Sequence, residues 1–373
     1  MNKQVLRGLS TALAGLMLLS ACSPAATAVP TATTGSVEPT TAAEEPTAEA
    51  TSAGSTEPVK LILGAYTTPR EAYAEILPLF AAQWLAETGQ TVTFEESYLG
   101  SGAQSRAVVE GFEADVVALS LEADVTRIVN AGLITHDWKT VGPYAGIVSD
   151  SVVAFAVRAG NPKNVHDWAD LAQAGLEVLT PNPETSGGAM WNILALSGAA
   201  LRGQVAGVAG DDEAAAQGFL ESVLRNVTVF DKGARESITN YESGVGDVAI
   251  TYENEVLVGQ QAGQDYELVI PSSTILIQNP VAVVDTYVDK HGTRAVAEAF
   301  VNFLFTTEAQ RIFAAHGLRS PDPVVQGETA SQYPPVADLF DIDYFGGWAE
   351  ATPKYFDPAT GIYYTAIANV QGQ

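Results

Sequence analysis

Residues 180–191 read TPNPETSGGAMW and join a short apolar segment to a long one. The preceding residues, 176–180, have the pattern of a β-strand, and two prolines then interrupt the chain before an apolar run with helical character begins. Serine is a preferred N-cap residue, so the simplest interpretation of Ser186-Gly187-Gly188 is a helix cap. The alternative is an anion site, because the first N–H groups of a helix have no partner within it.

The same order of strand, loop and helix extends along the chain on both sides of this stretch. An amphipathic helix is predicted from Pro69 to Gly89 and another at residues 293–306. Strands alternating with helices of this length predict an α/β fold with parallel sheets. Strands are expected at residues 59–63, 92–96, 114–119, 147–157, 176–180, 227–230, 248–251 and 281–284. The strands at 147–157 and 281–284 are candidates for crossings between two lobes.

The first 22 residues have the features of a lipoprotein signal peptide. Lys3 and Arg7 precede an apolar run at 13–19 that is too short to span a bilayer. The LSAC sequence at 19–22 resembles the lipobox of bacterial lipoproteins, which implies lipidation of Cys22; an ordinary secretory signal is the alternative. Cys22 is the only cysteine of 373 residues, which excludes disulfides and a cysteine-based metal site.

The rest of the chain is expected to form a tether followed by two lobes. Residues 23–57 are almost wholly Ala, Thr, Pro, Ser, Glu and Gly, a composition that predicts a disordered tether. Subtracting 57 from 373 leaves 316 residues, more than one hydrophobic core usually holds. We predict lobe 1 at 58–148, lobe 2 at 149–278, and a return to lobe 1 at 279–373 that ends in a C-terminal tail.

The formal net charge of −26 limits the possible partners. Nucleic acids and anionic lipids both require basic surface, so neither is expected to bind. Surface charges are screened beyond ~8 Å at physiological salt, whereas contacts inside a closed cleft are not. The acidity therefore makes anion binding less favourable without excluding it.

Three loops contain small residues and glycine, and each precedes a predicted helix. They are YLGSGAQ at 98–104, ETSGG at 184–188 and KGARES at 232–237. In α/β sheets ligands bind at such loops, beyond the carboxyl ends of the strands. If the three loops converge, their N–H groups form a concave set of donors suited to an anion.

Catalytic and metal-binding motifs are absent from the sequence. There is no G-x-S-x-G, H-E-x-x-H or Walker A pattern, and the four histidines lie far apart. Residues 341–346 superficially match a calcium loop, but its fifth position is Phe345, and its twelfth, Thr352, is not an acidic ligand. Glu253 and Glu255 are interpreted as helix-start residues rather than as a catalytic pair. We therefore predict a protein that is not an enzyme and has no metal or cofactor.

Several stretches between residues 59 and 356 resemble, in order, the sulfate-binding proteins of bacterial ABC-type uptake systems. They are GSG at 100–102, RAVVEGFEADVVAL at 106–119, RAGNPKNVHDWADL at 158–171, TPNPETSGGAMWN at 180–192, KGARES at 232–237, GDVAITYENE at 246–255 and FGGW at 345–348. The resemblance implies a two-lobed periplasmic-binding-protein fold of type II, with parallel or mixed sheets flanked by helices and a ligand cleft between the lobes. It also implies that backbone N–H groups, a serine hydroxyl and an indole N–H hold sulfate without a cationic side chain.

Residue by residue, the resemblance implies one site built from both lobes. Ser101 would offer its N–H and hydroxyl from lobe 1, and Arg235 would lie behind the site and polarise the backbone, a plain surface ion pair being the alternative. The N–H groups of the second lobe would come from Ser186, Gly187, Gly188 and Ala234.

Four positions depart from the family pattern. Tyr252 occupies the position where the family usually has tryptophan. Its hydroxyl would donate to the ligand from a different distance than an indole N–H, or the ring would merely pack beside the cleft. Thr67 replaces an aspartate near the site, Ala103 replaces a lysine, and Glu236 replaces a small residue. These changes leave open which tetrahedral oxyanion binds.

The expected function is capture of sulfate by a monomeric lipoprotein at the outer face of the cytoplasmic membrane, and delivery to an ABC permease and its ATPase. Contact with the membrane is expected through the lipid alone. Thiosulfate, molybdate or tungstate is the alternative ligand. A lipid-anchored hydrolase of sulfate or phosphate esters is the alternative of another class, and a signalling role would be compatible with binding.

Overall fold

The structure, a computed structural model, describes residues 56–372. The predicted signal peptide, Cys22 and nearly all of the predicted tether lie outside the described residues. The strands are β1 (Val59–Tyr66), β2 (Val92–Leu99), β3 (Val116–Ala118), β4 (Ile147–Val157), β5 (Val178–Pro181), β6 (Val227–Asp231), β7 (Val248–Tyr252), β8 (Glu267–Val269), β9 (Ser273–Val283) and β10 (Asp338–Phe340).

The described helices alternate with these strands, as the sequence pattern predicts. The α-helices are α1 (Arg70–Thr88), α2 (Ser101–Val109), α3 (Glu122–Asn130), α4 (Gly187–Leu201), α5 (Glu213–Leu224), α6 (Ala234–Glu242), α7 (Glu253–Gln261), α8 (Asp285–His291), α9 (Arg294–Leu304), α10 (Thr307–Ala315), α11 (Pro323–Glu328), α12 (Trp348–Phe356) and α13 (Ile362–Gln371). Three 3₁₀ turns, η1 (Trp138–Thr140), η2 (Trp168–Ala172) and η3 (Ile342–Phe345), lie between them. None of the helices in this part of the chain is long and apolar enough to cross a bilayer.

The strands follow one hydrogen-bonded path in the order β2-β1-β3-β9-β4-β7-β5-β6. At one end β1 pairs in parallel with β2 and β3, and at the other β5 pairs in parallel with β6 and β7. Between them, β9 and β4 are antiparallel to their neighbours. The predicted α/β class with parallel and mixed pairing is therefore confirmed. We call the β2-β1-β3 end with its helices the first lobe and the β7-β5-β6 end the second lobe.

Two long strands connect the lobes. The first half of β4 pairs with β9 and its second half with β7, while the end of β9 pairs with β3. The predicted strand at 147–157 coincides with β4. The strand predicted at 281–284 is only the end of β9, which begins at Ser273, because Gln278, Asn279 and Pro280 interrupt the apolar pattern.

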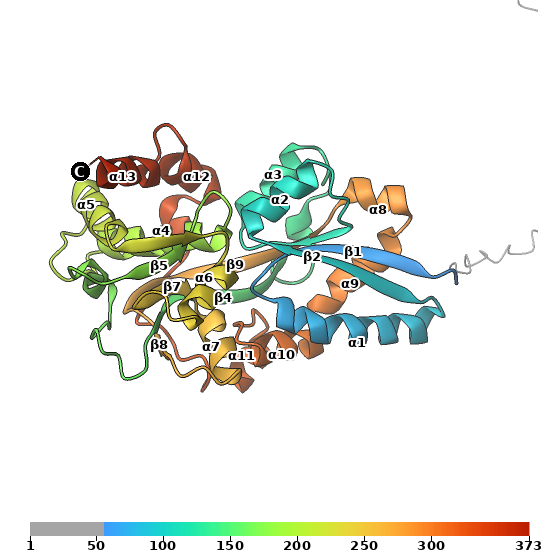
Figure 1. Ribbon diagram of the computed structural model, residues 1–373. Coiled ribbons are helices and arrows are strands. Elements are labelled where there is room, and N and C mark those ends of the chain that lie inside the picture. The colour runs from blue at the N-terminus through green and yellow to red at the C-terminus, as the bar shows by residue number, and fades with distance from the viewer. Residues whose placement is uncertain (1–55, 373) are drawn as a thin grey trace, which may run out of the picture. The chain divides into compact units, whose positions relative to one another are not determined.

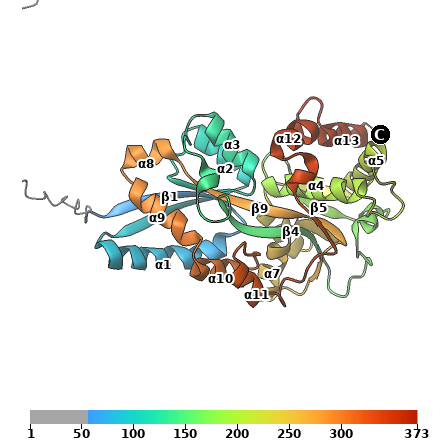
Figure 2. The same cartoon turned by 180° about the vertical axis from the view of Figure 1, so that it is seen from behind.

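Helices cover both faces of each lobe (Figures 1 and 2). In the first lobe α2 and α3 lie on one face of the strands, and α1, α9 and α10 lie on the other. Its core includes Phe300, whose ring centroid lies 5.2 Å from those of Phe80 and Phe94. In the second lobe the buried rings of Phe155 and Trp168 meet edge to face at 4.8 Å.

The C-terminal segment is packed on the second lobe. Helices α12 and α13 lie above α4 and beside α5 (Figure 1), and the rings of Trp348 and Trp191 meet at 4.7 Å. Buried Tyr355 and Tyr363 belong to the same apolar core as α4 and α5. The segment predicted as a tail of lobe 1 is thus two helices whose apolar side chains complete the second lobe's core. The other lobe boundaries stay a prediction.

Strand β4, which connects the lobes, also contains an aspartate, Asp150, whose carboxyl group is buried. Asp150 and Arg319 exchange backbone hydrogen bonds of 2.7 and 2.8 Å, yet Asp150 Oδ1 is buried and has no hydrogen-bond partner among the described residues. Burial raises the pKa of the Asp150 carboxyl to about 7, although the nearby charge of Arg319 opposes the shift.

This raised pKa predicts a pH-dependent stability. Between about pH 4 and 7 the unfolded chain loses the Asp150 proton while the folded chain keeps it, so stability should fall as pH rises through this range and level off above it. Asp150→Asn should lack this component. Urea unfolding at several pH values should give a free-energy difference, variant minus wild type, that grows with pH. A pH-independent difference would contradict the assigned pKa.

Candidate functional site

The three glycine-bearing loops converge on one small pocket between the lobes. Its cavity volume, measured as the space open to the centre of a water-sized sphere, is about 10 Å³. The first lobe and the second lobe both contribute walls, and none of the residues that line it carries a charged side chain. They are Tyr66, Thr67, Thr68, Gly100, Ser101, Ser120, Ser186, Gly188, Ala234 and Tyr252.

Each loop ends at the first turn of a helix. Gly100 precedes α2, Ser186 caps α4 by accepting a 3.3 Å hydrogen bond from Ala189 N–H, and Gly233 precedes α6. The cap interpretation of Ser186 is therefore correct in geometry. It does not compete with the anion interpretation, because a capped helix still has free N–H groups in its first turn.

Hydrogen bonds hold the three loops against one another. Ala103 N–H of α2 donates to Thr185 O at 3.1 Å, a contact between the two lobes. The Thr185 hydroxyl in turn donates to Lys232 O at 2.8 Å, which ties the second loop to the third. The first turns of α2, α4 and α6 are thereby fixed around the pocket.

Within residues 56–372, the N–H groups of Ser101, Gly187, Gly188 and Ala234 have no protein hydrogen-bond partner. Each belongs to the first or second residue of a helix, where no preceding turn supplies a carbonyl. Helix starts also carry about half a positive charge in their aligned peptide dipoles. The pocket therefore offers donors and positive potential without a cationic side chain.

Two of these residues must be glycine for steric reasons. A Cβ atom on Gly187 would lie 2.7 Å from Ser120 Oγ, and one on Gly188 would lie 2.7 Å from Tyr252 Cε2. The small residues let the walls of the pocket approach the start of α4 closely. Gly187 itself is buried beside the pocket rather than among the residues that line it.

The prediction that Ser101 offers its hydroxyl is wrong in this structure. Ser101 Oγ donates to Asp124 Oδ2 at 2.6 Å and accepts from Ser120 N–H at 2.9 Å. Asp124 is paired with Arg127 at 2.6 Å, and an ionised carboxylate can only accept, so the Ser101 hydrogen stays on that side. Ser101 retains its N–H. The N–H of Ser186, predicted as a donor to the anion, instead donates to Asn182 O at 2.9 Å, whereas Ser186 Oγ accepts from Ala189 N–H and keeps its own hydrogen for another partner.

Sequence reasoning missed three hydroxyl groups in the pocket wall. Ser120 Oγ lies 2.5 Å from Tyr252 Oη, and the buried hydroxyls of Tyr66 and Thr68 form no well-aligned hydrogen bond with another residue between 56 and 372. Burial raises the pKa of the Tyr66 and Tyr252 hydroxyls, so both remain protonated. Their positions at strand ends were the available signal, but single hydroxyl residues there are too common to be recognised.

Arg235 lies behind the pocket and pairs with carboxylates from both lobes. Its guanidinium contacts Glu71 of the first lobe at 2.5 Å and Glu255 of the second at 2.7 Å, and it donates to Thr68 O at 3.2 Å. Arg235 therefore belongs to a partly buried ion-pair network rather than a plain surface pair, and it hydrogen-bonds the backbone of a residue in the pocket wall. Its role in polarising that backbone stays a prediction. Thr67, predicted as a supporting residue, lines the pocket directly.

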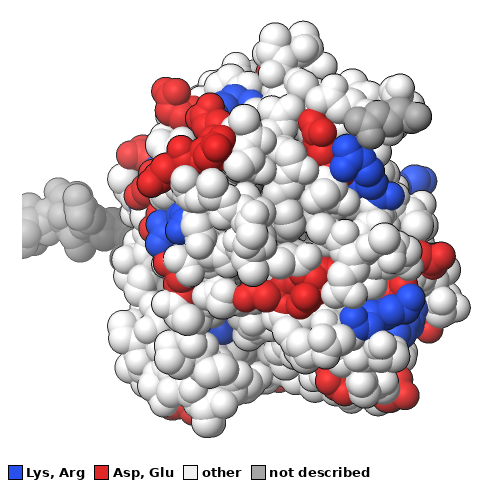
Figure 3. All heavy atoms as spheres, turned by 90° about the vertical axis from the view of Figure 1, so that its left-hand side faces the viewer, with Lys and Arg blue, Asp and Glu red and all other residues white. Residues whose placement is uncertain are grey.

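Some of the charged side chains near the pocket are paired with one another outside it. Arg319 binds Glu253 at 2.7 and 2.9 Å, so the two acids at the start of α7 have arginine partners. Arg70, Lys232 and Arg235 line a neighbouring groove that shares Thr67 with the pocket. On the molecular face in Figure 3, acidic and basic side chains form small separate patches.

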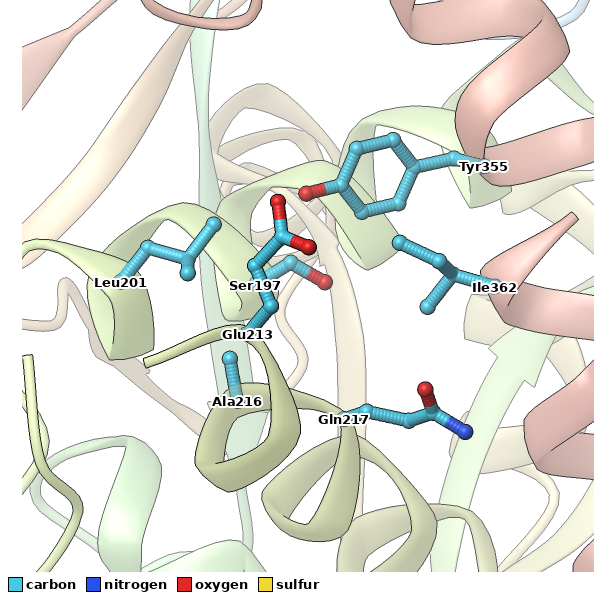
Figure 4. Close-up of a pocket in the computed structure, with 7 residues that line it drawn as sticks. All are labelled: Ser197, Leu201, Glu213, Ala216, Gln217, Tyr355 and Ile362. Atoms are coloured by element: carbon cyan, nitrogen blue, oxygen red, sulfur yellow. The ribbon is translucent and has the colours of Figure 1, made fainter. Parts of the chain in front are cut away.

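A second hollow lies beneath the C-terminal helices (Figure 4). Leu201, Ala216 and Ile362 give it apolar walls, and the carboxylate of Glu213 points toward it near Tyr355. Glu213 is paired with Lys354 at 2.6 Å. A carboxylate and apolar walls make this hollow unsuited to an anion. No group of three or more His, Cys, Asp or Glu residues in the described chain could hold a metal ion.

Residues 61–319 match the family model for bacterial extracellular solute-binding proteins. A sulfate-binding protein of Synechococcus elongatus is 46% identical, with 83% of this chain and 87% of the relative covered. A thiosulfate-binding protein of Escherichia coli is 36% identical, with 82% and 90% covered. The solved sulfate-binding protein SubI of Mycobacterium tuberculosis matches with a TM-score of 0.74 and 38% identity, with 80% of this chain and all of that chain covered.

The two ion pairs of Arg235 predict that removing the arginine destabilises the protein more than removing its exposed partner Glu71. Arg235→Met leaves Glu255, which is 1% exposed, without its cation, so the free energy of unfolding should fall by about 3 kcal/mol or more. Glu71→Gln removes a partner that is 35% exposed and should cost about 1 kcal/mol or less. Urea unfolding without added anion measures both. Equal losses would show that the Glu255 pair is not the dominant contact.

Proposed function

Because the chain belongs to the bacterial sulfate-binding proteins, within the extracellular solute-binding family, we propose that it captures sulfate outside the cytoplasm and delivers it to an ABC transporter. The observation that carries this proposal is the convergence of three helix starts on one pocket whose described walls have no charged side chain. The proposed contacts are the N–H groups of Ser101, Gly187, Gly188 and Ala234, with hydroxyls from Ser186 and Tyr252.

This arrangement suits a small dianion. Burying a charge without partners is very costly, but each hydrogen bond to a charged group contributes ~1.5–3 kcal/mol. The donors here are fixed by helix geometry, so little ordering is required when the anion binds. The dipoles of α2, α4 and α6 add favourable potential at the same point.

The pocket's donors also favour an anion without a proton. Sulfate has none at neutral pH, whereas phosphate carries at least one and needs an acceptor for it. Backbone N–H groups cannot accept a hydrogen bond. The carboxylate of Asp124, which contacts Ser101 behind the pocket wall, is already paired with Ser101 and Arg127. The acceptors that remain among the lining residues are hydroxyl oxygens, which accept more weakly than a carboxylate, so phosphate should bind less tightly than sulfate, by ~1–3 kcal/mol.

Thiosulfate is the second candidate ligand. A thiosulfate-binding relative is 36% identical over most of both chains. Tyr252, a hydroxyl donor where the family usually has an indole, is a feature that could change the accepted anion. A thermal-shift series with sulfate, thiosulfate, molybdate, tungstate and phosphate separates these ligands, since the one that binds the native state most tightly raises its apparent stability most.

The remaining parts of the proposal concern location and partners. The relatives are named as binding proteins, and we infer that this chain likewise binds its ligand without converting it. Anchoring through a lipid on Cys22, a monomeric state and a specific permease with its ATPase complete the proposed role. Mass spectrometry of the membrane-extracted protein tests the lipid, and assays with sulfate and phosphate esters test for hydrolysis.

A carboxylate placed at the start of α4 should abolish binding. In Gly187→Asp the new side chain would meet Ser120 Oγ and repel the anion, so sulfate titration calorimetry should show at least a hundredfold (~2.7 kcal/mol) weaker binding. Gly218→Asp is the matched control, because Gly218 is an exposed glycine of α5 with open space around it. Unchanged affinity in Gly187→Asp would refute the site.

The donor-only backbone predicts selectivity. Competition calorimetry near pH 7 should show sulfate preferred over phosphate by at least about tenfold. The physical reason is the phosphate proton, which finds no acceptor among the N–H groups. Equal affinities would contradict the proposed mode of recognition.

A further inference from the structure

Two buried hydroxyls from opposite lobes meet in the pocket wall. Ser120 follows β3 in the first lobe, and Tyr252 ends β7 in the second. Ser120 Oγ and Tyr252 Oη lie 2.5 Å apart, and each residue is 1% exposed. This contact forms a hydrogen bond between the lobes directly at the pocket.

The backbone of Ser120 is fixed from three directions. Its N–H donates to Ser101 Oγ at 2.9 Å, and its carbonyl accepts from Trp191 Nε1 of α4 and from Asn279 Nδ2 of β9, both at 3.0 Å. The peptide of Ser120 is thus held by α2, α4 and the crossing strand β9. Only rotation of the hydroxyl hydrogen is left free.

The pair lies against the start of α4. The Cβ positions of Gly187 and Gly188 would fall 2.7 Å from Ser120 Oγ and 3.3 Å from Tyr252 Oη, respectively. Both hydroxyls therefore adjoin the residues whose N–H groups we assign to the anion. Any oxyanion held by those N–H groups is within reach of one or both hydroxyls.

Counting hydrogens shows what the pair can offer. Two hydroxyls contain two hydrogens, and the bond between them uses one. Unlike the Ser101 hydroxyl, which must donate to Asp124, neither member has a further acceptor among the described residues. One O–H therefore remains, and it can belong to Ser120 or to Tyr252, depending on which of them donates within the pair.

We propose that Ser120 and Tyr252 act as one hydrogen-bonding unit that presents a single O–H donor to the bound oxyanion from whichever oxygen is better placed. The inference rests on the proposed function, because it assumes the anion in this pocket. It adds Ser120 as a ligand contact. It also makes the hydroxyl donor depend on closure, since its two halves come from different lobes.

This redundancy predicts a characteristic mutant pattern. Ser120→Ala leaves the Tyr252 O–H free to donate to the anion, and Tyr252→Phe leaves the Ser120 O–H. Each single variant should lose less than about threefold in sulfate affinity, whereas the double variant should lose at least about tenfold. Calorimetric titration with sodium sulfate measures all four proteins.

Matched controls separate this effect from general damage to the fold. Tyr241→Phe removes a buried phenol hydroxyl, and Ser320→Ala removes a buried serine hydroxyl that donates to Gln310 at 2.6 Å; neither residue lines the pocket. Both controls should bind sulfate as the wild type does. Thermal unfolding without anion confirms that each variant is folded.

The alternatives give different patterns. If Tyr252 alone contacts the anion, Ser120→Ala is silent and the double variant matches Tyr252→Phe, which would overturn the proposal. The proposal would also be overturned if the fold-loss in sulfate affinity of the double variant equalled the product of the fold-losses of the two single variants. If the wild type binds neither sulfate nor thiosulfate, the proposed function itself fails. The titration of the wild type shows this before any variant is compared.

Discussion

The structure depends on one requirement: backbone N–H groups at three helix starts must find a partner other than the protein. Helices α2, α4 and α6 begin at the same pocket, and the first-turn N–H groups of Ser101, Gly187, Gly188 and Ala234 have no acceptor in the part of the chain that the structure describes. Leaving buried donors unpaired is costly, so an arrangement that gathers them at one point is best explained by an anion that satisfies them together.

Other features of the fold serve that arrangement. The parallel ends of the sheet bring strand-to-helix loops to one side, and the crossing strands β4 and β9 bring the two sets of loops into contact. Glycine at 187 and 188 lets Ser120 and Tyr252 approach α4. Arginines at 235, 319 and 127 neutralise carboxylates behind the pocket, and no carboxylate is among the residues that line it. An acidic protein can in this way contain a local site for anions.

The sequence was sufficient for features that depend on neighbouring residues. The strand at 147–157, the helix ending at Gly89 and the three glycine-bearing loops are all local patterns, and the structure has each of them. Features that depend on contacts distant in sequence were missed. The Ser101 hydroxyl is used by Asp124, the Ser120–Tyr252 pair joins residues on different lobes, and α12 and α13 complete the core of the second lobe. The residues next to a single serine or aspartate in the sequence do not indicate which distant residue it will contact.

The central claim is that peptide N–H groups rather than cationic side chains hold the anion. Amide chemical shifts of ¹⁵N-labelled protein, followed during titration with sulfate, test it most directly. The account predicts that the largest downfield shifts of amide protons belong to Ser101, Gly187, Gly188 and Ala234. If these signals stay in place while the side-chain signals of Arg70 or Lys232 in the neighbouring groove move instead, the account is wrong.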